Sequence, residues 1–310
     1  MGVTSMTKGE MTFAPYCRNG WRGWILEGWQ QLPELADLDV WLHDPHQSVV
    51  LEAPCRTISR RETALGPVYV KLMRGGNDGA VRNREIISWL KWTLLPSRGE
   101  HILKVTAAMA AHGHRCPTPV LGARCRGRWG YPSELFVSRE VIQPTLEECL
   151  ARAAGPDEQQ NLLAFTAEQL ARFHRDNFVH GDFLPRNVCV DSQAGHLYFL
   201  DNDRTHHWPF PPPFVRPRRN LAQFCYNLML LDGSGQSRLP DGFLKAYAEA
   251  RPDWSLPRRR TEIALVQAQC DCRWKKHGAR ELAWRERRQR READRPGIPA
   301  DQAGEPPGQG

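Results

Sequence analysis

The sequence predicts an α+β fold with two lobes, a small β-rich N-terminal lobe and a mainly helical C-terminal lobe. Strand-like apolar runs cover residues 51–61 and 65–73, in the first part of the chain. The clearest helical periodicity covers residues 161–177, in the second half. We therefore expect four segments: a flexible N-terminal segment over residues 1–20, an N-terminal lobe over 21–142, a C-terminal lobe over 143–290 and a disordered tail over 291–310.

Composition limits the class of protein before any motif is considered. A chain of 310 residues is long enough for one two-lobed domain or two small ones. Its net charge of +7 favours phosphate-rich partners such as nucleotides, anionic glycolipids or a membrane surface. Nine scattered cysteines without paired C-x-x-C motifs indicate reduced thiols. The sequence shows neither a signal-peptide pattern nor a membrane span, so we expect a cytoplasmic protein, with a peripheral role at a membrane left open.

Lys71 stands inside the apolar strand predicted over residues 65–73. Burying an unpaired ammonium is costly, so Lys71 needs an anion. In a nucleotide site the phosphates are that anion, and a Glu on a helix positions the Lys. The helices predicted over residues 80–95 and 100–112 offer Glu85 and Glu100. Taken alone, the strand favours the simpler alternative, a Lys on the solvent side of an edge strand, and only the polar cluster around Asp182 favours the phosphate site.

The next strand, predicted over residues 135–142, leads into a linker. A nucleotide base could hydrogen-bond the backbone near Glu140 and Val141, where the chain leaves this strand. Thr145 then precedes a helix, and Glu148 completes a capping-box pattern. Further on, the helix over residues 161–177 leads directly into His180, which would hold the following turn rigidly.

Three polar side chains at set separations, Asp182, Asn187 and Asp201, mark the stretch from residue 179 to 204. Two apolar runs, over residues 188–190 and 197–200, predict a hairpin that would bring the three together. The chemistry that needs such a cluster is phosphoryl transfer, in which one Asp receives the proton of the attacking hydroxyl while an Asn and a second Asp hold Mg²⁺. The pattern H-x-D-x-x-x-x-N with a later Asp is typical of protein-kinase-like folds. A polar turn with capping residues is the simpler alternative, but it leaves the two apolar runs unexplained.

Basic residues follow this stretch. The prolines between residues 209 and 217 are predicted to exclude helix and sheet. Arg216, Arg218 and Arg219 form a cationic patch that either holds an anionic acceptor or is solvated. From residue 273 the chain is again Arg-rich, as in a solvated helix or one that touches anionic lipid. We expect no nucleic-acid partner.

Together these motifs resemble the lipopolysaccharide core kinases, the heptose and Kdo kinases of Gram-negative bacteria, over roughly residues 50–230. The resemblance implies a protein-kinase-like fold, ATP and Mg²⁺ as cofactors, and a sugar hydroxyl of the lipopolysaccharide inner core as acceptor, reached at the cytosolic face of the inner membrane. It also favours Glu100 over Glu85 beside Lys71. The motifs that carry it are Tyr69-Val-Lys71, Gly113…Pro117-Thr-Pro119, Thr145-Leu-Glu147, His180-Gly-Asp182…Asn187 and Leu200-Asp201.

The residues and the resemblance together predict a role for each site residue. Asp182 orients the acceptor hydroxyl and takes its proton, while Arg186 and Arg204 steady the phosphoryl group or an anionic acceptor. For the cofactors, we expect Lys71 and Glu100 at the ATP phosphates, Glu140 and Val141 at the base, and Asn187 and Asp201 at Mg²⁺.

Two departures from this pattern keep alternatives open. No G-x-G-x-x-G precedes the Lys71 strand, and Ser59-Arg60-Arg61 stands near that turn, which allows a pseudokinase scaffold. The complete set of Lys71, Asp182, Asn187 and Asp201 opposes a scaffold. His180-Gly-Asp182 replaces His-Arg-Asp, as in aminoglycoside and choline kinases, which allows a small-molecule acceptor; the basic charge opposes the cationic acceptors of those enzymes.

Overall fold

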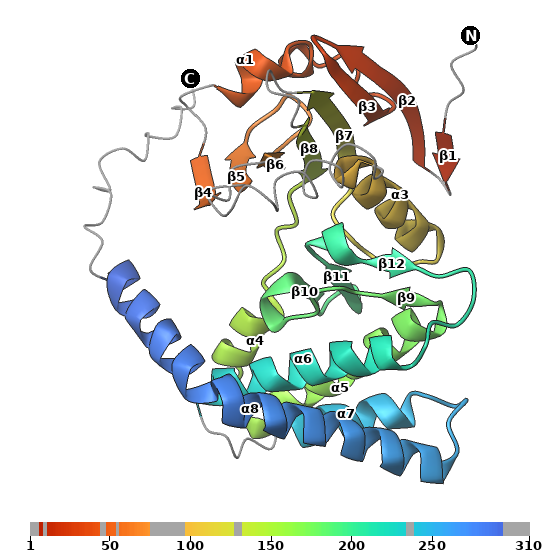
Figure 1. Ribbon diagram of the computed structural model, residues 1–310, viewed down its shortest axis with the longest axis vertical. Helices are drawn as coiled ribbons and strands as arrows, with labels where there is room; N and C mark the ends of the chain where they lie inside the picture. The colour runs from red at the N-terminus through yellow and green to blue at the C-terminus, as the bar shows by residue number, and fades with distance from the viewer. Residues whose placement is uncertain are drawn as a thin grey trace, which may run out of the picture.

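The computed structural model describes residues 6–8, 11–43, 48–53, 56–74, 97–126, 132–233 and 239–293. Figure 1 shows two lobes, a β-sheet above and a helical lobe below, which is the predicted α+β architecture. The helix expected over residues 80–95, with Glu85, lies outside the described residues. So does the predicted tail from residue 294 on, whereas its first residues, 291–293, belong to a helix.

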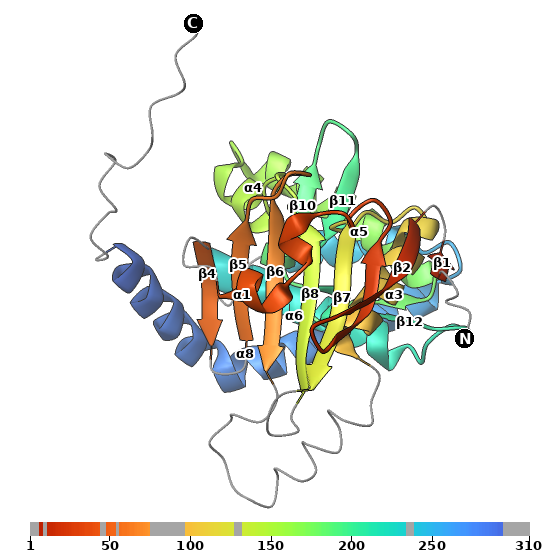
Figure 2. The same ribbon diagram turned by 90° about the horizontal axis from the view of Figure 1, so that it is seen from above.

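The N-terminal lobe is built on an eight-stranded antiparallel sheet in the order β1-β2-β3-β7-β8-β6-β5-β4, seen from above in Figure 2. The strand β6 carries Lys71 and lies between β8 and β5. Val68, Val70 and Leu72 of β6 are buried in the core on one face, and alternation turns Lys71 to the other. The strands are β1 (Met6–Lys8), β2 (Met11–Arg18), β3 (Trp21–Leu26), β4 (Ser48–Ala53), β5 (Arg56–Arg61), β6 (Val68–Arg74), β7 (Pro119–Arg126) and β8 (Pro132–Arg139).

The expectation of a flexible segment over residues 1–20 is wrong for residues 11–18, which form β2 and pair with β3. Phe13 is fully buried against Leu103 and Ala107, and the Tyr16 hydroxyl donates to the Leu35 carbonyl at 2.8 Å. Two aromatic anchors thus hold a strand whose composition is otherwise mixed and polar.

Two helical elements cover the outer face of the sheet and α3 the inner one. The η1 turn (Pro33–Leu35) and α1 (Leu38–Leu42) pack on the outer face, where Leu38 and Trp41 join its core. The helix α3 (Arg98–Ala111) packs beneath β7 and β8, between the sheet and the helical lobe (Figure 1). Its N-terminus is fixed by the fully buried carboxylate of Glu134, which accepts from the backbone N–H groups of Arg98 and Gly99 and pairs with Arg124 at 2.6 Å.

The C-terminal lobe is helical around an aromatic core. Phe173, Phe183, Phe199 and Phe224 are buried together, and they join α5, the 180–187 turn, the small hairpin and α6. Among the described residues, no helix is long and apolar enough to cross a membrane. The elements are α4 (Leu146–Arg152), α5 (Pro156–Arg175), β9 (Phe178–Val179), η2 (Pro185–Asn187), β10 (Val188–Asp191), β11 (His196–Phe199), η3 (Asn202–Arg204), β12 (His206–His207), α6 (Val215–Asp232), α7 (Leu239–Glu249) and α8 (Leu256–Ala293).

The Pro-rich stretch after Asp201 is shorter than expected. The helix α6 already begins at Val215 and includes Pro217, so the exclusion of helix up to residue 217 is wrong. Pro217 lies in the first helical turn, where a backbone N–H has no partner within the helix and its absence costs little. Arg216, Arg218 and Arg219 are therefore helical residues.

Candidate active site

A cleft of ≈ 1090 Å³ is lined by residues of both lobes. The N-terminal lobe contributes Tyr69 and Lys71 from β6, and the chain that follows β8 contributes residues 140–144. The C-terminal lobe contributes Asp182, Asn187 and Asp201, the polar cluster predicted from the sequence. Among the cleft residues are Lys71, Glu140, Val141, Asp182, Arg186, Asn187, Asp201 and Arg204, which are all the predicted site residues apart from Glu100.

The predicted hairpin forms and brings Asn187 and Asp201 together. The strands β10 and β11 pair antiparallel, with Val188 opposite Phe199. At the open end of the hairpin, the N–H of Leu200 donates to the carbonyl of Asn187 at 2.8 Å. Asp201 follows Leu200 directly, so this hydrogen bond holds Asp201 near Asn187. Asp201 has φ +53°, a left-handed conformation that only Asp and Asn among larger residues adopt readily. Such a backbone, held by its surroundings, is a common feature of active sites.

Lys71 reaches across the cleft to the helical lobe. Its ammonium contacts a carboxylate oxygen of Asp201 at 2.6 Å and one of Asp203 at 3.1 Å. Burial alone would raise the pKa of Asp201, but the charge and hydrogen bond of Lys71 outweigh it and hold that pKa below its ordinary value. The Asp201 carboxylate is therefore ionised at neutral pH.

The expected pair between Lys71 and Glu100 is absent. Glu100 stands in the first turn of α3 and pairs with Lys104 along the same helix. Lys71 instead takes both of its carboxylates from the segment that follows β11. Glu85, the other helical candidate, lies outside the described residues.

The turn that carries Asp182 is fixed by a buried neutral histidine. His180 is fully buried, and desolvation lowers its pKa. Its Nε2–H donates to the Leu200 carbonyl at 2.7 Å, and its Nδ1 accepts from the Asp182 N–H at 3.2 Å. The same side chain therefore ties the Asp182 turn to the strand end that delivers Asp201.

Gly181 explains why the sequence reads His-Gly-Asp here. A Cβ at residue 181 would lie 2.1 Å from the Cβ and 2.3 Å from the carbonyl oxygen of Arg204. A side chain at this position would therefore force the two segments apart, whatever the acceptor.

We expect Gly181→Ala to lower the free energy of unfolding by about 3 kcal/mol, the upper end of overpacking costs, because the clash is partly with backbone atoms. Gly155→Ala is the matched control, since a Cβ at residue 155 meets nothing within 4 Å, and it should cost less than about 1 kcal/mol. Chemical denaturation of both variants measures the difference. Equal stabilities would show that Gly181 is not required by packing.

Side chains of α6 also support Asp182 and its turn. This contact was not predicted from the sequence. Gln223 Nε2 donates to Asp182 Oδ1 at 2.6 Å, while Asn187 Nδ2 donates to the Asp182 carbonyl at 2.9 Å. Asn220 donates to the His180 carbonyl and accepts from His174 at 3.3 Å. Since burial lowers the pKa of His174 to about 3, this second histidine is also neutral. A rigid, hydrogen-bonded support for a reacting carboxylate is what a preorganised site requires.

The predicted base-binding residues are placed at the hinge between the lobes. The Glu140 carboxylate is engaged by Arg60 at 2.8 Å, which lowers the pKa of Glu140, and the Glu140 N–H donates to the Pro67 carbonyl at 3.0 Å. Among the described residues, none hydrogen-bonds the backbone of Val141. Val141 thus has the backbone groups that a base could use, whereas the backbone N–H of Glu140 is already engaged.

Arg56 is a cleft residue that the sequence interpretation missed. The strands β4 and β5 precede the Lys71 strand and pair up to Ala53 opposite Arg56, and Ser59-Arg60-Arg61 lies inside β5. Ile58 pairs with Lys71 across β5 and β6, and alternation places Arg56 on the same face. Arg56 is close enough to help lower the pKa of Asp201, and no described acidic residue forms a salt bridge with it. An Arg at the start of a strand is too common to be recognised as a site residue without the register of the strands.

This two-lobed fold, with a Lys in the sheet facing an Asp, Asn and Asp cluster in the helical lobe, is the arrangement predicted for a protein-kinase-like protein. A family model described as "Lipopolysaccharide kinase (Kdo/WaaP) family" matches residues 78–237, just over half of the chain, including Asp182, Asn187 and Asp201. The protein belongs to this family. It is therefore a lipopolysaccharide kinase that uses ATP.

A solved structure, "WaaP in complex with acyl carrier protein", is similar in fold. The similarity covers 76% of this chain and 88% of that chain at 17% sequence identity, with a TM-score of 0.50. It confirms the predicted protein-kinase-like fold. A search of curated proteins found no match.

Proposed function

We propose that this protein transfers the γ-phosphoryl group of Mg²⁺-bound ATP to a hydroxyl of a heptose or Kdo residue in the lipopolysaccharide inner core. The observation that carries the proposal is the convergence of Lys71, Asp182, Asn187 and Asp201 on one cleft between the lobes. Membership of a lipopolysaccharide kinase family supports the acceptor class over an aminoglycoside or choline, and it argues against a pseudokinase scaffold.

Asp182 is the proposed general base. Its Oδ1 is held by Gln223, and its backbone is held by His180 and Asn187, so the carboxylate is oriented without being neutralised by a cation. In the reaction the acceptor hydroxyl gives its proton to Asp182 while its oxygen forms the bond to the γ-phosphorus. The bond from that phosphorus to the bridging oxygen breaks, and ADP leaves.

Asn187 and Asp201 fit a magnesium site. Both offer the oxygen ligands that Mg²⁺ prefers. Asn187 donates through Nδ2 to Asp182, and none of the described residues hydrogen-bonds its Oδ1, which stays available as a ligand. When bound, Mg²⁺ would neutralise charge on the phosphates. Lys71, now paired with Asp201 and Asp203, lies where it can also bind a phosphate oxygen.

Two exposed arginines lie at the cleft beside the proposed catalytic and magnesium-binding residues. Arg186 and Arg204 line the cleft beside Asp182 and Asp201. Among the described residues, neither forms a salt bridge. They are the proposed contacts for the transferring phosphoryl group or an anionic sugar.

Arg56 is the proposed phosphate contact of the β4–β5 hairpin, in place of a glycine-rich loop. We expect Arg56→Ala to raise the KM for ATP about tenfold, because one charge-assisted hydrogen bond to the nucleotide is lost. The change in kcat should be smaller. Arg56→Lys should keep most of the affinity. Arg22→Ala, an exposed arginine on β3, is the control. If Arg56→Ala and Arg22→Ala have the same KM, Arg56 does not contact the nucleotide.

An acceptor panel tests the proposed function. Purified protein with Mg²⁺ and ATP is offered deacylated core oligosaccharides that end in heptose or Kdo, and a set of aminoglycosides and choline. We expect ADP release only with a core oligosaccharide, and the responsive sugar identifies the acceptor. Turnover with an aminoglycoside or choline, and none with the core, would contradict the proposal.

A further inference from the structure

Three large apolar side chains are exposed on the helical lobe, outside the cleft, at or shortly before the starts of α6 and α8. Phe210 is 76% exposed, Val215 57% and Leu256 69%. Phe210 lies in the segment between β12 and α6, Val215 begins α6 and Leu256 begins α8. We call these three side chains and the exposed arginines Arg216, Arg219 and Arg258 the loop–helix patch.

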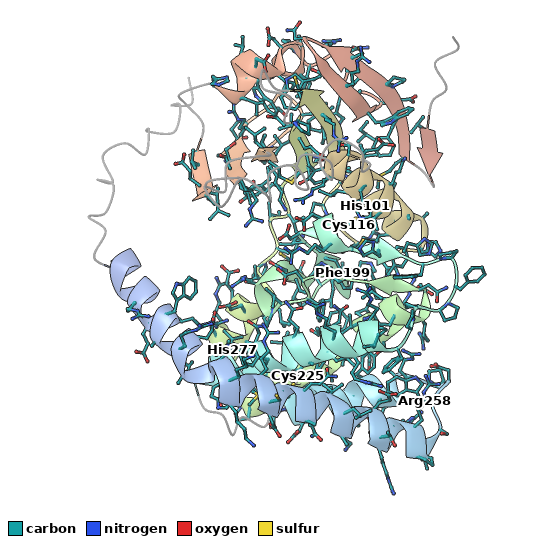
Figure 3. All side chains as sticks on the ribbon, viewed as in Figure 1. His101, Cys116, Phe199, Cys225, Arg258 and His277 are labelled. Carbon is teal, nitrogen blue, oxygen red and sulfur yellow. The ribbon has the colours of Figure 1, made fainter. Side chains whose placement is uncertain are left out.

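Ring contacts join the two parts of the loop–helix patch. The rings of Phe214 and Trp254, the first next to Val215 and the second near Leu256, have centroids 4.9 Å apart. The Arg258 guanidinium lies 5.7 Å from the Phe214 ring and 5.4 Å from the Trp254 ring. Figure 3 shows Arg258 at this end of α8. The start of α8 therefore packs beside the start of α6, which brings these two parts of the patch together.

The loop–helix patch has an unbalanced positive charge. Two carboxylates lie against it, but Asp253 pairs with Arg251 at 2.6 Å and Glu262 pairs with Arg218 at 2.8 Å. Among the described residues, no salt bridge involves Arg216, Arg219 or Arg258. Exposed apolar side chains rimmed by unpaired cations suit the boundary between the headgroups and acyl chains of an anionic membrane.

The α6 helix connects the loop–helix patch to Asp182. Arg216, Arg219 and Gln223 lie along one side of α6 because they are spaced by three and four residues. Gln223 hydrogen-bonds Asp182. From Arg216 to Gln223 the helix rises about 10 Å. A sugar whose lipid is anchored beside Arg216 therefore needs to extend only about this far to reach the carboxylate.

We propose that the loop–helix patch docks the protein onto an anionic phospholipid surface and so presents lipid-linked acceptor to Asp182. The presentation of acceptor rests on the proposed function, whereas the docking itself does not. An acidic protein surface is the competing occupant, and the experiment separates the two.

Vesicle co-sedimentation of the full chain tests the docking. We expect binding to phosphatidylcholine vesicles that contain phosphatidylglycerol, little binding to phosphatidylcholine alone, and weakening with salt. The double variant Phe210→Ser, Leu256→Ser should bind at least ~10-fold more weakly, because both side chains would leave the acyl boundary. Val40→Ser with Leu65→Ser is the matched control, since these residues are also exposed (71% and 43%) but lie in the N-terminal lobe.

The activity of the same proteins separates the two proposals. The Phe210/Leu256 variant should phosphorylate soluble deacylated core like the unaltered protein, but vesicle-embedded acceptor at least ~10-fold more slowly. Unaltered protein that binds vesicles yet phosphorylates neither acceptor would overturn the proposed function and leave the docking intact. Equal vesicle binding by the unaltered protein and the Phe210/Leu256 variant would overturn the docking. Absence of vesicle binding by the unaltered protein would also overturn the docking. If the protein then bound an acidic acyl carrier protein, and the Phe210/Leu256 variant did not, the patch would be assigned to a protein partner.

Discussion

Asp182→Asn should lower kcat for phosphotransfer by ~10²-fold or more and leave the affinity for Mg²⁺-bound ATP nearly unchanged. The amide is isosteric and can still accept from Gln223 through its oxygen, so the turn keeps its hydrogen bonds. What is lost is the group that receives the proton of the acceptor hydroxyl. Steady-state kinetics give kcat, and calorimetry gives the nucleotide affinity.

Asp157→Asn is the matched control for this prediction. Asp157 is an exposed carboxylate in the first turn of α5, outside the cleft, so its loss should leave kcat unchanged. If Asp182→Asn turned over as fast as Asp157→Asn, Asp182 would not be the base.

Asp201→Asn is the second substitution for which we expect a large effect. It should lower kcat/KM for ATP by ~10²-fold or more, because a magnesium ligand is replaced by a neutral and weaker one. In the unaltered protein, ATP affinity should rise steeply with Mg²⁺ concentration, and in the variant this dependence should be nearly lost. Calorimetric titration with ATP at several Mg²⁺ concentrations measures both.

Asp203→Asn makes a sharp comparison, because Asp203 also contacts the Lys71 ammonium, at 3.1 Å against 2.6 Å for Asp201. Each variant removes one negative charge beside Lys71, but only Asp201 is a proposed metal ligand. Asp203→Asn should therefore lose less than ~10-fold and keep its Mg²⁺ dependence. Equal losses in the two variants would mean that Asp201 acts only through Lys71.

The sequence predicted those parts of the site that follow from local chain pattern. The apolar run around Lys71 predicted its strand, and the two apolar runs after Asn187 predicted the hairpin that delivers Asp201. Both inferences depend only on the period of a strand and on residues close in sequence.

Residues that reach the site from distant segments could not be predicted in this way. Gln223 and Asn220 support the Asp182 turn from α6, and nothing in a lone helix shows which residue it will face. Arg56 needed the register of β5 against β6. The partner of Lys71 was wrongly expected to be Glu100. Glu100 instead forms an ion pair with Lys104, which lies one turn further along the same helix.

The N-terminal part of the fold was missed for a related reason. In β2, Phe13 and Tyr16 are spaced by three residues rather than two, so the segment lacks the alternation expected of a strand. Its burial comes from contacts with α3 and with the residue 35 carbonyl, which are far away in sequence. Tertiary packing therefore decides the structure of this segment.

We propose that this protein adds one phosphate to an inner-core sugar through Asp182. Mass spectrometry of core oligosaccharide from cells that lack the protein, complemented with the unaltered chain or with Asp182→Asn, tests it most directly. We expect the core to lack one phosphate without the protein, to regain it with the unaltered chain, and to remain without it in cells that express Asp182→Asn at the same level. A core with full phosphate in the cells that lack the protein, or in those with Asp182→Asn, would contradict the claim.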